Sequence, residues 1–229
     1  MIEVIVPWRG GCPHRERAWE HVRELYPTEW KLTVASPPEG PWVKALAVNP
    51  AIRSSSAGII IVADADCWTD GLERAVEAVR SGASWAVPHK GVVRLSERGS
   101  EAVYRGEPWE GQPLAERPYG GVIGGGFVVA HREVLLSVPM DPRFKGWGQE
   151  DHSWGLALHT LAGRPWRGMA HLVHFWHPPQ ERLARKWGSK ESKALFHRYH
   201  AAANKPDHMR SLLHEFASTD QPASDDHRP

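Results

Sequence analysis

The sequence predicts an α/β fold with a mainly parallel central sheet flanked by helices. Between residues 2 and 87, short apolar runs that are typical of buried strands alternate with helical patterns. This alternation favours parallel strands, because a parallel pair needs a crossover connection that is usually a helix. The run Ala57–Ala63 carries no polar side chain, which is typical of a central strand covered on both faces.

Prolines mark the ends of the first strand and the first helix. Ile2–Val6 is a short apolar run that Pro7 ends. A helix can begin at Pro13, because the missing N–H of proline is harmless in a first turn, and Pro27 stops it. The residues at helical spacing on its apolar face are Ala18, Val22, Leu25 and Tyr26.

The next elements continue the alternation. Trp30–Ala35 is expected to be a strand, and Lys44–Ser54 a helix that is broken or started near Pro50. After the central strand, Thr69 can cap a helix that Gly82 ends. The buried stripe of that helix is formed by Leu72, Ala75, Val76 and Val79.

The rest of the chain is less regular. Residues 91–118 are polar and rich in turn formers, so a long excursion or a hairpin is expected there. The expected strands are 85–87, part of 119–130 and 172–175, and the expected helices are 150–161 and 181–203. The last helix carries six basic residues, which are Arg182, Arg185, Lys186, Lys190, Lys193 and Arg198. Residues 217–229 are expected to be a disordered tail.

Composition excludes several classes of protein. The 229 residues include 28 basic and 27 acidic ones, so bulk charge alone does not hold the chain to a polyanion. No apolar run approaches the ~18 residues of a membrane span. Two cysteines, Cys12 and Cys67, offer no disulfide framework and favour a reducing cytoplasm. The 12 tryptophans suit either stacking on sugars and bases or filling of the core.

A pair of acids follows the central strand. Asp64 and Asp66 are two residues apart, so both side chains leave one face if the strand geometry continues. In open α/β sheets, ligands bind just outside the carboxyl ends of the strands. Two carboxylates there suit Mg²⁺ or Mn²⁺ shared with substrate phosphates. The alternative is a polar turn in which Asp66 or Thr69 only caps the next helix.

The segment Gly146-Trp147-Gly148-Gln149-Glu150-Asp151 forms a second cluster. Its glycines allow close backbone approach and an exposed indole. Glu150 and Asp151 stand at a helix start, where the helix dipole keeps carboxylates ionised and weakly basic. The pattern fits a carboxylate base beside an aromatic platform for a ring-shaped acceptor. The alternative is a plain acidic first turn.

Three histidines, His171, His174 and His177, lie close together before Pro178. Neutral imidazoles are good ligands for borderline metal ions, and His174 and His177 flank the end of the expected strand. The alternative is one core histidine with the others at the surface, because the chain has 14 histidines.

Taken in order, these segments resemble the GT-A glycosyltransferases. Pro7-Trp8-Arg9 is similar to the Pro-aromatic-Arg start of the β-1,4-galactosyltransferases. Lys44–Asn49 followed by Gly58–Asp66 resembles the family-two-like pattern before a metal-binding Asp-x-Asp, and Gly124–Phe127 resembles the glycine strand beside the donor sugar. Gly146–Asp151 is similar to the Gly-Trp-Gly-Gly-Glu-Asp signature shared with the polypeptide N-acetylgalactosaminyltransferases. The resemblance covers roughly residues 2–178.

The resemblance implies the GT-A fold, with a nucleotide-diphosphate sugar as donor, in the first instance a UDP-sugar. Asp66, with Asp64 close by, would bind Mn²⁺ or Mg²⁺ that bridges the donor diphosphate, and His174 or His177 would complete the shell of the ion. The residues that the resemblance places at the donor are Pro7, Trp8, Arg9, Lys44, Asn49, Asp64, Ala65, Gly125 and Gly126.

The resemblance also implies the chemistry. Asp151 would be the general base that takes the proton of the acceptor hydroxyl, and Glu150 would contact a sugar. Trp147 and Gly148 would form the acceptor site. Direct displacement with one base implies inversion at the anomeric carbon.

The sequence departs from the pattern at two positions. Gln149 replaces the second Gly of the signature, and His152 replaces the third acid of the galactosyltransferases. No stem, membrane anchor or lectin domain is recognised, so a bacterial or phage enzyme in the cytoplasm of a bacterium or an infected cell is expected. The expected organisation is a catalytic domain at 1–178, a helical extension at 179–216 and the tail.

Two other functions stay open. A glycosyltransferase acting on modified DNA bases would use the basic helix and the tryptophans to hold a strand with a flipped base. A non-catalytic carbohydrate-binding protein on the same scaffold is the other, although the intact Asp64, Asp66 and Asp151 argue against it. The acceptor, whether glycan, protein or nucleobase, stays open as well.

Overall fold

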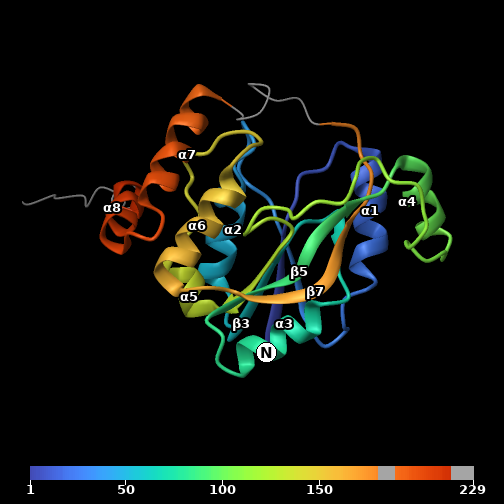
Figure 1. Ribbon diagram of the computed structural model, residues 1–229, viewed down its shortest axis with the longest axis horizontal. Coiled ribbons are helices and arrows are strands. Elements are labelled where there is room, and N and C mark those ends of the chain that lie inside the picture. Colours follow the sequence, from blue (N-terminus) through green and yellow to red (C-terminus); the bar gives the residue numbers. More distant parts are fainter. Residues whose placement is uncertain (180–188, 218–229) are drawn as a thin grey trace, which may run out of the picture.

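A mixed sheet forms the centre of the molecule in a computed structural model, which describes residues 1–179 and 189–217 (Figure 1). Its strands are β1 (Ile2–Pro7), β2 (Lys31–Ala35), β3 (Ile59–Ala63), β4 (Cys67–Trp68), β5 (Trp85–Arg94), β6 (Phe127–His131) and β7 (Trp166–His174). Their order across the sheet is β2-β1-β3-β6-β5-β7-β4. The sheet is mainly parallel in direction, because only β6 and β4 run against the other strands in the described part of the chain.

Helices cover both faces of the sheet. They are α1 (Pro13–Arg23), α2 (Lys44–Ser54), α3 (Leu72–Arg80), α4 (Glu97–Tyr104), α5 (Arg132–Ser137), α6 (Glu150–Ala162), α7 (Lys190–Ala202) and α8 (Pro206–Ala217). The buried faces of α1 and α3 join one core cluster, and those of α2, α5 and α6 join the other. Within the described ranges, every helix falls short of the length or the apolar character that a membrane span requires.

The central strand divides its side chains between the two cores. On β3, Ile60 and Val62 pack with α2 and α6, whereas Ile59, Ile61 and Ala63 pack with α1 and α3. Successive side chains of a strand point to opposite faces, so an all-apolar run is what a doubly covered strand requires. The predicted central strand is confirmed.

The region between residues 88 and 126 differs most from the expected elements. β5 continues past Val87 to Arg94, with register shifts where it pairs with β7. Helix α4 follows at once, capped by the Ser96 hydroxyl, which accepts a hydrogen bond from the Gly99 amide at 3.1 Å. β7 begins at Trp166, earlier than the predicted strand at 172–175. Irregular pairing explains the miss, because the bulges interrupt the two-residue periodicity.

Two helices follow the sheet at the carboxyl end of the described chain. Only residues 190–202 of the expected helix at 181–203 are seen as α7, and Arg182, Arg185 and Lys186 lie outside the described residues. Helix α8 falls in the expected helical extension at 179–216. Of the predicted tail at 217–229, Ala217 belongs to α8 and residues 218–229 lie outside the described residues. Figure 1 places α7 and α8 on the outer side of α6, and their apolar residues join the core cluster of α2, α5 and α6.

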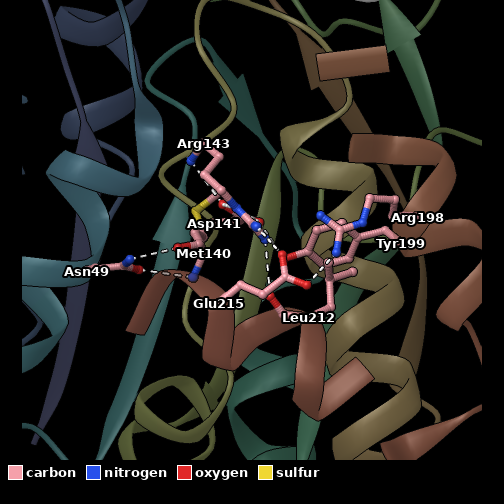
Figure 2. A network of polar contacts seen from close by, with 8 residues as sticks. All are labelled: Asn49, Met140, Asp141, Arg143, Arg198, Tyr199, Leu212 and Glu215. Atoms are coloured by element: carbon pink, nitrogen blue, oxygen red, sulfur yellow. Dashed lines mark hydrogen bonds and ion pairs between the residues drawn. The ribbon is translucent and has the colours of Figure 1, made fainter. Parts of the chain in front are cut away.

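A polar network holds these two helices to the segment before α6 (Figure 2). The buried Asp141 carboxylate accepts a hydrogen bond from the Tyr199 hydroxyl of α7 at 2.8 Å. Arg143 binds the same carboxylate at 2.7 Å and donates to Glu215 of α8 at 2.6 Å. Because Asp141 stands shortly before Gly146, α7 and α8 brace the segment that leads into the Gly146–Asp151 motif.

Candidate functional site

The carboxyl end of β3 and the glycine segment before β6 are joined by Asp64. The Asp64 amide donates to the Gly126 carbonyl at 2.9 Å, and the Gly126 amide donates to Asp64 Oδ2 at 3.2 Å. Gly126 has a φ of +75°, and a Cβ there would lie 2.0 Å from Leu172 Cδ1. Only glycine fits this position, so the close approach of the two segments depends on it.

A buried lysine links the two motifs that the sequence singled out. Lys44, the first residue of α2, donates from Nζ to Asp64 Oδ1 at 2.7 Å and to Asp151 Oδ1 at 2.8 Å. Its side chain is only 4% exposed. Burial alone would lower the pKa of Lys44, but Asp151 and Asp64 outweigh it and raise that pKa. The lysine therefore stays charged and balances the two carboxylates.

Asp66 is the centre of a separate cluster. Arg15 donates from Nε to Asp66 Oδ2 at 2.9 Å. His177 Nε2 lies 3.4 Å from Asp66 Oδ2, and His174 Nε2 lies 4.0 Å from Asp66 Oδ1. The Cys67 thiol lies 3.6 Å from Asp66 Oδ1. The structure thus brings both late histidines to Asp66, whereas His171 makes an edge contact with Trp109 instead.

The charge of this cluster is set by Arg15. Burial opposes ionisation of Asp66, but His174, Arg15 and His177 outweigh it and hold its pKa well below the usual range. Burial lowers the pKa of His174 to about 4, so that imidazole is neutral at pH 7. The cation that balances Asp66 at neutral pH is therefore the Arg15 guanidinium.

This cluster fits a divalent metal ion. The ligand atoms of Asp66, Cys67 and His174 lie within 4.8 Å of one another, and His177 adds a second imidazole next to Asp66. Carboxylate oxygen and neutral imidazole nitrogen suit first-row divalent ions. Asp64 does not belong to this cluster, because Lys44 and Gly126 bind its two carboxylate oxygens.

The Gly146–Asp151 segment brings aromatic rings to the same edge of the sheet. The Trp147 indole stacks on Trp42, with centroids 5.5 Å apart and planes 10° from parallel. The Gly146 amide donates to the Trp42 carbonyl at 2.7 Å. Arg15 lies over the Trp147 ring at 5.0 Å, within the range of a cation–π contact. Through Arg15, the aromatic pair lies next to the Asp66 cluster.

The two acids at the start of α6 have different roles. Glu150 Oε2 accepts a hydrogen bond from the Gly148 amide at 2.7 Å and so closes the turn in front of its own helix. Burial, with the neighbouring Asp151 charge, raises the pKa of Glu150 to about 7. Gln149 precedes them with a φ of +73°, a left-handed conformation that is unusual for a residue other than glycine.

The basicity expected for Asp151 is corrected. Its place at a helix start predicts an ionised, weakly basic carboxylate. In the structure, burial raises the pKa of Asp151, Lys44 opposes this shift and Asp64 supports it. Desolvation wins over the helix dipole, because the carboxylate is turned into the site toward Lys44 rather than toward water.

Several of the expected donor residues have structural partners. Arg9 donates to the carbonyls of Gly40 at 2.6 Å and Pro38 at 2.9 Å, so it holds the loop after β2. The Asn49 amide exchanges two hydrogen bonds with the Met140 backbone, at 2.8 and 3.0 Å (Figure 2).

The remaining expected donor residues line the ends of the central strands. Pro7 ends β1 and Ala65 is fully buried. Trp8 lies under Arg15 at 5.9 Å. Gly125 donates to the Val122 carbonyl in the turn before β6. Of these four residues, Ala65 lies between Asp64 and Asp66 in the chain, and Trp8 reaches the Asp66 cluster through Arg15.

Sequence reasoning missed Arg15, Cys67 and Arg94 as neighbours of the metal cluster. Arg15 sits in the first turn of α1 among other charged residues, so nothing distinguishes it from a solvated side chain. Arg94 ends β5, where it pairs with His174 of β7. Burial lowers the pKa of His174 and the Arg94 charge adds to that shift, whereas burial raises the pKa of Cys67 and the Arg94 charge only partly opposes it. Arg94 lies beyond the expected strand at 85–87, so the sequence did not indicate that it ends β5 at the ligand-binding edge.

A cavity of about 600 Å³ lies elsewhere and contains none of these groups. It is lined by residues at the amino ends of β1 and β2 and by α3, including Met1, Trp30 and Glu77. The candidate site lies at the opposite, carboxyl ends of the strands. We place the chemistry there because that is where the titratable groups converge.

No family model matches the sequence, and no curated protein is significantly similar to it. Solved structures are similar in fold. GalNAc-T7, in complex with UDP, GalNAc and Mn²⁺, is 13% identical with a TM-score of 0.54, and the match covers 94% of this chain and 55% of that one.

Two further structures are similar. Glucosyl-3-phosphoglycerate synthase from Mycobacterium tuberculosis, with Mn²⁺, UDP-glucose and phosphoglyceric acid, is 15% identical with a TM-score of 0.50, over 89% of this chain and 79% of that one. The catalytic domain of Drosophila β1,4-galactosyltransferase 7, with xylobiose, is 17% identical with a TM-score of 0.48, over 72% and 63%. The chain spans less than two thirds of the galactosyltransferase domain and of GalNAc-T7. The chain has the GT-A fold of these glycosyltransferases.

Proposed function

We propose that this protein is a metal-dependent, inverting glycosyltransferase that uses a UDP-sugar. The observation that carries the proposal is the Lys44 bridge, which holds Asp151 beside Asp64 at the ligand-binding edge of a GT-A sheet. A base and a metal cluster at one edge are what sugar transfer from a nucleotide diphosphate requires. The similarity in fold to UDP-sugar enzymes supports the donor class.

Each residue then has a task. Asp66, His174 and His177 would hold Mn²⁺ or Mg²⁺, which stabilises the negative charge of the leaving diphosphate. Arg15 and Arg94 add positive charge beside the same oxygens. Asp64 and Gly126 would hold the Gly124–Phe127 segment beside the donor sugar. The Asp151 carboxylate accepts the proton of the acceptor hydroxyl as that oxygen attacks the anomeric carbon from the face opposite the diphosphate.

Trp147 and Trp42 would contact the acceptor. They stack on each other, and Arg15 lies over Trp147 at 5.0 Å and Arg9 over Trp42 at 5.7 Å, so a pyranose would stack on either indole only after an arginine moves. A modified DNA base would also stack there. The described part of α7 and α8 adds basic side chains, but Glu191, Asp207 and Glu215 lie among them, so no continuous basic surface favours a nucleic acid.

Metal removal tests the proposal directly. In calorimetry with UDP-glucose and UDP-galactose, we expect binding with Mn²⁺ and none with excess EDTA, and Asp66→Ala should behave like EDTA. Slow Mn²⁺-dependent hydrolysis of the bound donor, with an α-configured donor giving the β-anomer in proton NMR, supports an inverting enzyme. Binding of either donor that is equally strong with EDTA contradicts the metal role. Binding without any turnover of donor favours a carbohydrate-binding protein.

A further inference from the structure

We propose that Cys67 is a ligand in the metal cluster, so that the site binds a borderline ion such as Zn²⁺ or Co²⁺ through sulfur as well as through nitrogen and oxygen. This inference rests on the proposed function in one respect, which is that both place a metal ion at the cluster around Asp66. It adds a ligand class that Mn²⁺ and Mg²⁺ do not prefer.

Strand pairing places Cys67 at the cluster. β4 and β7 are antiparallel, and Cys67 pairs directly with His174. Directly opposed residues on neighbouring strands project from the same face of the sheet, with Cβ atoms about 4.5–5.5 Å apart. The strand pairing therefore makes the Cys67 thiol and the His174 imidazole neighbours. Asp66 is the residue directly before Cys67.

The separations of the donor atoms agree with a four-ligand site. Cys67 Sγ lies 3.6 Å and His174 Nε2 lies 4.0 Å from Asp66 Oδ1, and His177 Nε2 lies 3.4 Å from Asp66 Oδ2. Bond lengths of about 2.0–2.3 Å to a tetrahedral ion put neighbouring ligand atoms about 3.3–3.7 Å apart. The separations from Asp66, 3.4–4.0 Å, are therefore close to those that a tetrahedral ion requires.

Charge permits a thiolate ligand once an ion is bound. The Asp66 carboxylate and a Cys67 thiolate would balance the two positive charges of the ion, and the Arg15 guanidinium, which pairs with Asp66 at 2.9 Å, would leave the cluster with one net positive charge. On binding, the S–H bond breaks, a sulfur–metal bond forms and the proton leaves to water. Without an ion, the buried thiol lies within hydrogen-bonding distance of Asp66 and is unreactive.

Cobalt spectroscopy on the metal-free protein tests the proposal. Titration with Co²⁺ should give a near-ultraviolet sulfur-to-cobalt charge-transfer band together with visible d–d bands. Cys67→Ser should lose the charge-transfer band and keep the d–d bands. Cys12→Ser is the matched control, because it removes the other cysteine, and it should keep both. A wild-type spectrum with d–d bands alone, or a charge-transfer band that survives in Cys67→Ser, overturns the proposal.

Metal affinities give a second measurement. Cys67→Ser should weaken Zn²⁺ binding by at least about tenfold and change Mn²⁺ binding by less than about threefold, because only the softer ion depends on sulfur. Equal losses for both ions contradict a sulfur ligand. If Cys67→Ser does not fold, cadmium NMR on the Cys12→Ser protein decides, since a sulfur ligand moves the resonance far downfield. Mn²⁺-dependent UDP-sugar binding that persists without any sulfur signal rejects this inference and leaves the proposed function intact.

Discussion

At the scale of single residues, the Lys44 ammonium lies between two carboxylates that would otherwise repel each other. Asp64 and Asp151 come from different motifs, one after β3 and one at the start of α6, and they meet only through Nζ. Removing the cation from such a buried set leaves uncompensated charge, which is far more costly than losing a surface pair. The lysine therefore opposes the rise that burial causes in the pKa of Asp151, the proposed base.

Substitution of Asp151 tests the base. Asp151→Asn should lower kcat by about 10²–10⁴-fold, because asparagine keeps the size and the hydrogen bonding but cannot take a proton. Donor affinity in calorimetry should change little, since the base acts in the transition state. In the wild type, kcat should fall as pH drops through the raised pKa of Asp151. Near-normal turnover by Asp151→Asn would reject the assignment.

The pKa of Glu150 has a consequence for stability. Because this pKa is raised from 4.5 to about 7 in the fold, ionisation of the buried Glu150 opposes folding, and stability falls as pH rises between these values. Glu150→Gln removes this cost and can still accept from Gly148. Urea unfolding should find the variant more stable than wild type by about 1–3 kcal/mol at pH 8, with little difference at pH 4. An equal difference at both pH values would contradict a raised pKa.

The residues that sequence could identify are those with a fixed relation to a strand end or a helix start. Asp64, Asp66 and Asp151 are in this class. Arg15 is not, because whether it reaches Asp66 depends on how α1 packs over the sheet. Asn49 shows the converse, since its place in a recognised pattern suggested the donor while the fold uses its amide to bind Met140.

At the scale of elements, α6 packs against the glycine segment with no space for side chains. A Cβ at Gly124 would lie 2.4 Å from the Asp151 carbonyl oxygen, and one at Gly155 would lie 2.0 Å from the Ile123 carbonyl oxygen. A side chain at either glycine would have to displace backbone atoms, so helix α6, which carries Asp151, and the segment beside Asp64 are held in one relative position.

This contact predicts an unequal response to alanine. Gly124→Ala combines a backbone clash with a φ of +94°, so it should destabilise the protein by about 2–4 kcal/mol and lower kcat. Gly120→Ala, in the same loop, meets nothing within 4 Å and should change stability by less than about 0.5 kcal/mol. Urea unfolding of both variants measures the difference. Similar effects at both positions would mean that the contact does not constrain α6.

The spacing of apolar residues predicted those helices and strands whose apolar residues recur regularly. The strands β1 to β3 and helices α1 to α3 have clear apolar patterns and were expected near their observed places. The long β5 and β7 were predicted only in part, because bulges shift their register and short-range patterns are lost. Helix α8 lies in the expected helical extension at 179–216, although no separate helix was placed there. Its buried residues Met209, Leu212, Leu213 and Phe216 have helical spacing, so a local signal was present.

At the scale of the whole molecule, the carboxyl-terminal helices share the core and the polar network of the sheet domain. Asp141 is the shared acceptor, with Arg143 on one side and Tyr199 on the other (Figure 2). Arg143 also binds Glu215 and the Leu212 carbonyl of α8. Both helices are thus held by the Asp141 carboxylate, which lies shortly before the Gly146–Asp151 segment in the chain.

Removal of one hydroxyl tests this dependence. Tyr199→Phe should destabilise the protein by about 1–3 kcal/mol, because the buried Asp141 carboxylate loses a donor. Tyr26→Phe is the control, since that buried hydroxyl has no partner within the described residues, and its removal should be neutral or slightly stabilising. Thermal unfolding compares the two. Equal effects would mean that the network contributes nothing beyond packing.

The stacked Trp42 and Trp147 also provide a spectroscopic signal for the geometry of the site. Two nearly parallel indoles 5.5 Å apart couple their electronic transitions, so they should produce an exciton couplet in the far-ultraviolet circular dichroism spectrum. Trp147→Phe isolates this signal from the other tryptophans by difference. Trp147 belongs to the Gly146–Asp151 segment, and Trp42 belongs to the loop before α2. Loss of the couplet on adding a donor or a metal would therefore show that this segment and this loop separate.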